Sequence, residues 1–147
     1  MATSSSARTD TAAGFLARPA DDLVLERTEE LLRSLQGCAS VEAAAALAAE
    51  RLPELTGADW AGYSPAQGAA DRAHGILASA AIADACVYSQ GQPPTVAAVP
   101  VLVAGAPVGV ILMGRRNGLF TPQLHIAALC AEHAGRVEPG LALARTA

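Results

Sequence analysis

The sequence contains no lysine: its ten basic residues are all arginines, against fourteen acidic residues, and the net charge is −4. Only Arg115 and Arg116 are adjacent, so the sequence predicts no basic surface and disfavours nucleic acid as the main partner. The arginine bias, together with the excess of alanine, is typical of a GC-rich bacterial genome. Arg115 and Arg116 are interpreted as a solvated pair, with an anion or a partner's carboxylates as the alternative.

Aromatic residues make up only 3 % of the chain, so we expect a core of Ala, Val, Leu and Ile side chains. The three cysteines, Cys38, Cys86 and Cys130, are far apart and form neither a CxxC motif nor a zinc-binding spacing. We therefore expect no metal and no cofactor, with thiols as small core residues. Long apolar runs and a secretory signal are also lacking, which predicts a cytoplasmic protein without a membrane span.

A chain of 147 residues fits one domain with a tail. Residues 1–19, rich in Ser, Thr and Ala, are predicted to be a disordered tail, and residues 20–147 to form a single domain. Its first part, residues 20–37, is predicted to be helical from Asp21 to Gln36. Four residues there fall at helical spacing: Val24, Thr28, Leu31 and Leu35. This stripe either packs on its own domain or is shared with a second copy of the chain.

A second helix is predicted from Ser40, a good N-cap, to about Leu55, and Thr56-Gly57 is predicted to end it. A strand follows at 58–64. The middle is less regular: residues 74–80 are predicted to be a strand and 81–90 to be helical.

The clearest β pattern is a hairpin made of the apolar runs 96–103 and 108–113. Pro100 cannot donate a ladder hydrogen bond, so it predicts an edge or a bulge. Thr121 and Pro122 predict the N-cap and first residue of a last helix, which carries a face of small residues over 127–134.

The order of these segments resembles a GAF domain over about residues 40–137. The matching pieces are Ala98-Val99-Pro100, Gly109-Val110-Ile111, Phe120-Thr121-Pro122, the Ala-rich final helix, and Gly57-Ala58-Asp59 at the first strand. The chain is similar to GAF domains that precede RNA-binding output domains in actinobacterial regulators. The resemblance implies an α+β fold, in which N-terminal and C-terminal helices pack on one face of an antiparallel sheet. It also implies small-molecule sensing or protein association.

The segment between Tyr63 and Thr95 is short for the lid that covers the ligand cavity in that family. We therefore favour a non-catalytic regulatory module that acts by association, as a homodimer or with another protein partner. The dimer would form through the helix at 20–37 and the C-terminal helix. The alternatives are a sensor of a small apolar or aromatic metabolite and a thiol redox enzyme that uses Cys86 beside His74.

A ligand cavity would lie between the sheet and the middle segment. Trp60 and Tyr63 have a second interpretation, in which they complete an aromatic-poor core. No catalytic or metal-binding residues are predicted. The candidate ligand-binding residues are Trp60, Tyr63, His74, Cys86, Tyr88, Val99, Val101 and Met113.

Overall fold

The computed structural model describes residues 10–137, with side chains from Asp22 onward. The chain divides between Glu30 and Leu31 into two units. The helix α1 (Asp10–Gln36) crosses this division and starts well before the predicted position at Asp21. The first nine residues of the predicted tail lie outside the described residues, and the proposed domain boundary at residue 20 stays a prediction.

In the second unit, the helix α2 (Val41–Thr56) has the ends that the sequence predicted. The Ser40 hydroxyl accepts a hydrogen bond from the Ala43 N–H at 3.0 Å, which satisfies one of the free donors of the first turn. Gly57 ends the helix in the left-handed conformation, with φ +75°, which glycine adopts without strain. Pro53 lies in the last turn and its carbonyl accepts from the Gly57 N–H.

A four-stranded antiparallel sheet has the order β1-β4-β3-β2. The long central hairpin of β3 (Val96–Val103) and β4 (Ala106–Gly114) confirms the predicted pair of apolar runs. The strand β1 (Trp60–Pro65) pairs along β4, whereas β2 (Tyr88–Gln90) covers only the first residues of β3. Next to Pro100, the ladder between β3 and β4 has a register shift between Val101 and Leu102, where Val108 of β4 is left without a partner residue on β3.

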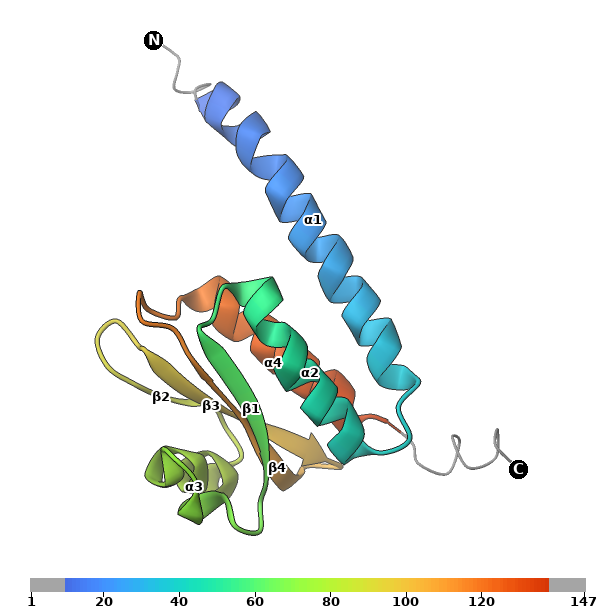
Figure 1. Cartoon of the computed structure of the whole chain (residues 1–147), viewed down its shortest axis with the longest axis vertical. Coiled ribbons are helices and arrows are strands. Elements are labelled where there is room, and N and C mark those ends of the chain that lie inside the picture. The colour runs from blue at the N-terminus through green and yellow to red at the C-terminus, as the bar shows by residue number, and fades with distance from the viewer. Residues whose placement is uncertain (1–9, 138–147) are drawn as a thin grey trace. The chain divides into compact units, whose positions relative to one another are not determined.

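The two faces of the sheet are covered by different helices (Figure 1). On one face lie α2 and α4 (Thr121–Gly135), which pack on each other and on the sheet over the larger core. On the other face lies α3 (Gly75–Asp84), after the short 3-10 helix η1 (Ala69–Asp71), over a smaller core. The fold is therefore α+β, with the predicted N-terminal and C-terminal helices on one face. Both faces are apolar because both are covered.

Two local predictions were wrong. Residues 75–84, partly predicted to be a strand, form α3, and residues 88–90, predicted to be helical, form β2. A short Ala-rich apolar run fits a buried helix as well as a strand, and the intrinsic preference of alanine for helix decides here. The final helix also begins one residue early: Phe120 is its N-cap, and the Gln123 side chain accepts a hydrogen bond from the Phe120 N–H.

Within the described residues, no helix has the length and apolar character needed to cross a membrane.

Candidate functional site

The outer edge of β3 is left without a strand where β2 ends. The three residues of β2 pair with Val96, Ala97 and Ala98. Beyond them, within the described part of the chain, no strand pairs with the outer edge of residues 99–103. An uncovered edge exposes backbone groups and the apolar side chains that flank them.

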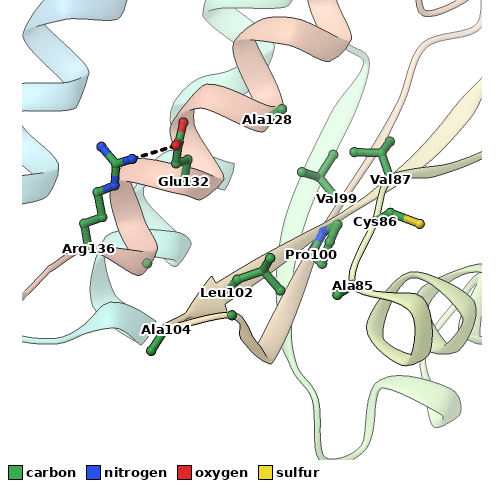
Figure 2. A pocket seen from close by; sticks show the side chains of 12 residues that line it. Ala85, Cys86, Val87, Val99, Pro100, Leu102, Ala104, Ala128, Glu132 and Arg136 are labelled. Carbon is green, nitrogen blue, oxygen red and sulfur yellow. Dashed lines mark hydrogen bonds and ion pairs between the residues drawn. The ribbon is translucent and has the colours of Figure 1, made fainter.

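A pocket of about 590 Å³ lies at this edge, and its walls come from three parts of the second unit. Figure 2 shows α4 on one side, β3 across the floor, and the segment that joins α3 to β2 on the other side. The volume falls within the range of roughly 300–1,000 Å³ typical of small-molecule sites. The lining residues are Ala85, Cys86, Val87, Val99, Pro100, Leu102, Ala104, Gly105, Ala128, Glu132, Gly135 and Arg136.

The only charged side chains in this lining are Glu132 and Arg136, one turn apart on α4. The Arg136 Nη2 donates to the Glu132 Oε2 at 2.7 Å, the contact dashed in Figure 2. Both side chains are more than half exposed. Such an exposed i,i+4 pair contributes only about 0.3–0.5 kcal/mol of stability, so little free energy is needed to open it.

The end of α4 is held against β3 at this wall. Gly135 packs so closely on the Leu102 backbone that a Cβ there would overlap the Leu102 carbonyl oxygen and lie 3.1 Å from its carbonyl carbon. Only glycine permits this approach. The contact fixes the helix turn that carries Glu132 and Arg136 relative to the pocket floor.

Of the eight predicted ligand-binding residues, Cys86 and Val99 line this pocket. Val99 is almost fully buried and points to the α4 side of the sheet. Cys86 is exposed, and Figure 2 shows its sulfur turned away from α4. The structure therefore brings these two residues together without aiming the thiol at the pocket.

Three others, Tyr63, Val101 and Met113, lie in the larger core between the sheet and α2 and α4. Val101 and Met113 are fully buried. The Tyr63 ring covers Gly109 on the neighbouring strand, and its hydroxyl is buried without a hydrogen-bond partner. This desolvation, with a smaller contribution from the Glu42 carboxylate, raises the pKa of Tyr63 above its usual value.

The remaining three, Trp60, His74 and Tyr88, belong to the opposite side of the sheet. The Trp60 indole stacks on the His74 imidazole, with ring centroids 5.4 Å apart and an interplanar angle of 9°. His74 and Tyr88 line a separate hollow of about 520 Å³ beside α3. The Tyr88 hydroxyl donates to the Asp84 carboxylate, which raises the pKa of Tyr88. The sheet thus separates the predicted residues into groups that no single site contains.

Neither the thiols nor the arginine pair forms a reactive cluster. Cys130 is buried in the larger core, and burial raises the pKa of its thiol to about 11. The Arg115 guanidinium donates to the Gly118 carbonyl of its own loop, and the Arg116 N–H donates to the Asp59 carboxylate. Among the residues with described side chains, no three His, Cys, Asp or Glu side chains gather closely enough to hold a metal ion.

Sequence reasoning missed most of the pocket, including Val87, Leu102 and Ala128. The signal that was available is the pair Glu132 and Arg136, four residues apart, which places opposite charges together on a helix. What the sequence does not indicate is that β2 ends after three residues and leaves this edge open.

Comparison with known proteins adds no family assignment: no family model matches the chain, and no curated protein is similar enough to be counted as a relative.

Proposed function

We propose that this chain is a non-catalytic regulatory module of GAF type that responds to a small molecule with an apolar body. The observation that carries the proposal is the pocket of about 590 Å³ at the uncovered edge of β3. A ligand there would contact α4, β3 and the segment 85–87 at once. It would therefore favour the arrangement of these segments in which the pocket is formed, which is how a bound ligand shifts a conformational equilibrium.

The same edge is poorly suited to the addition of a further strand. Pro100 lies within the uncovered part of β3, has no N–H to donate, and lies next to the register shift at Val101 and Leu102. Proline and irregularities are devices that keep a sheet edge from pairing with another chain. The apolar hollow beside the edge is better suited to a compact molecule than to an extended peptide.

The surfaces that motivated a homodimer are largely used within the chain. Leu31 and Leu35, half of the stripe on α1, are buried in the larger core, and so is the small-residue face of α4 at Ala127, Ala131 and Ala134. These side chains contribute to the stability of one copy. Because these side chains are buried within one copy, they are not available for association, and association through these faces is no longer the favoured function.

The proposal is tested by thermal unfolding of the full chain against a library of small molecules with apolar bodies. A ligand at 100 times its dissociation constant adds about 2.7 kcal/mol to the free energy of unfolding, which raises the melting temperature by several degrees. Compounds that do so are then measured on Ala128→Phe, in which the new ring occupies the pocket beside α4.

The matched control is Ala46→Phe, the same exchange at an exposed position of α2 that does not line the pocket. We expect the ligand-induced rise to disappear in Ala128→Phe and to persist in Ala46→Phe. If no compound stabilises the chain, or if the rise is undiminished in Ala128→Phe, the edge pocket is not a ligand site.

Association through α1 is a second candidate function, favoured by Leu25, which is 60 % exposed. Exposed leucines on a helix are suited to packing against another helix. Sedimentation of the full chain tests this candidate: self-association that Leu25→Glu abolishes supports it, and a monomer at tens of micromolar excludes a dimer of that strength.

A further inference from the structure

We infer that the ligand of the edge pocket is a zwitterion: a small molecule with an apolar body and with one cationic and one anionic group close together. The inference rests on the proposed function, because it names the chemistry of the molecule that the pocket would bind. Its basis is the distribution of charge in the lining. Ten of the twelve lining residues are uncharged, and the remaining two, Glu132 and Arg136, form one ion pair on one wall.

The pair offers one site for each sign of charge. Its two charged groups are 2.7 Å apart at their closest atoms, so a single small molecule that carries both charges can reach both of them. The Glu132 carboxylate can accept hydrogen bonds from a ligand ammonium, and the Arg136 guanidinium can donate to a ligand carboxylate. The apolar body then lies over the floor formed by Val99 and Leu102.

A ligand with a single charge fits this wall less well. A carboxylate on Arg136 would lie beside the Glu132 carboxylate, and an ammonium on Glu132 would lie beside the guanidinium, so each would meet a like charge at close range. The chain's net charge of −4 further disfavours the approach of an anion. A zwitterion avoids both penalties because it pairs with each member of the wall and is neutral as a whole.

Opening the existing pair is not an obstacle. Both side chains are exposed, at 64 % for Arg136 and 54 % for Glu132, so each stays hydrated when the direct contact is broken. Among the described residues, neither side chain has another hydrogen-bond or ion-pair partner that would hold the pair closed. The ligand therefore exchanges one weak contact for two new ones.

The test uses four probes that share a phenyl ring on a short alkyl chain and differ in the groups at its end. L-phenylalanine is the zwitterion, 3-phenylpropanoate the anion, 2-phenylethylamine the cation and 3-phenyl-1-propanol the uncharged probe. Their dissociation constants with the full chain are measured by calorimetric titration at low salt. Exposed ion pairs have modest individual strength. We therefore expect the zwitterion to bind at least about fivefold more tightly than each of the other three, and the advantage to shrink in high salt.

Two variants locate the effect. Glu132→Gln should remove the advantage of L-phenylalanine over 3-phenylpropanoate, and Arg136→Gln its advantage over 2-phenylethylamine. The matched controls are Glu54→Gln and Arg51→Gln, which make the same exchanges at exposed positions of α2 outside the pocket and should leave all four affinities unchanged.

The failure of this inference is distinguishable from the failure of the proposed function. If the uncharged or a singly charged probe binds as tightly as L-phenylalanine, and Ala128→Phe abolishes that binding, the pocket is a ligand site but the zwitterion inference is overturned. It is also overturned if the zwitterion's advantage survives both Glu132→Gln and Arg136→Gln, or if no probe binds. If no probe binds, the thermal-unfolding test with the library of small molecules still shows whether the edge pocket is a ligand site.

Discussion

Gly109 and Tyr63 provide a quantitative test of how β1 and β4 are packed. A Cβ at position 109 would overlap the Tyr63 hydroxyl and lie 2.6 Å from two carbons of its ring, where ordinary contacts are 3.4 Å or more. Gly109→Ala therefore forces the half-buried Tyr63 ring to move by roughly 1 Å. Overpacking of this kind costs about 1–3 kcal/mol, and the gain of about 0.5–1 kcal/mol from replacing a strand glycine offsets part of it. We expect a net loss of about 1–2 kcal/mol.

The assay is urea unfolding of the full chain, arranged as a double-mutant cycle. Tyr63→Leu shortens the side chain that lies over Gly109, so Gly109→Ala should cost little or nothing in that background. The coupling energy between the two positions should exceed about 1 kcal/mol. The matched control is Gly62→Ala, since a Cβ at Gly62 would meet no atom within 4 Å. Equal costs of Gly109→Ala in both backgrounds, or a Gly109→Ala variant as stable as the wild type, would refute this packing.

Three further predictions concern single residues. Burial raises the pKa of the Cys130 thiol to about 11 in the folded chain, so the unfolded chain loses this proton first as the pH rises. The free energy of unfolding should therefore fall by about 2–3 kcal/mol between about pH 9 and 11. Urea unfolding should show a shallower fall in Cys130→Ala. Gly135→Ala overlaps the Leu102 backbone, which cannot rotate away, so it should cost at least about 3 kcal/mol in the same assay. Ser40→Ala loses the bond from Ala43 and should cost about 1 kcal/mol, measured by thermal unfolding and recovered largely in Ser40→Asp.

The parts of the fold that the sequence predicted are those determined by nearby residues. Ser40 and Gly57 carry their own capping chemistry, and the apolar runs of β3 and β4 are joined by a connector too short for anything but a hairpin. The interpretation of Pro100 as an edge position was confirmed, because β2 pairs only with residues 96–98 of β3 and no described strand covers the outer side of β3 at Pro100.

The candidate site was harder to predict because it depends on where segments end in space. Val99 and Tyr63 are both predicted strand residues and both contribute to the larger core, yet only Val99 also lines the edge pocket. The Ala-rich segment at 75–84 gave no decisive period, so the face that α3 covers could not be assigned. Glu132 and Arg136 have the sequence pattern of any solvated helix face, and only the pocket beside them gives them a proposed role.

The most direct test of the central claim is to map amide chemical-shift changes by NMR while the chain is titrated with the compound that stabilises it most. A small molecule in the edge pocket should shift the amides of residues 85–87, 99, 101–105 and 128–136, and leave β1 and the first turn of α3 unchanged. Shifts centred instead on His74 and Tyr88, or spread without focus over the surface, would contradict the account.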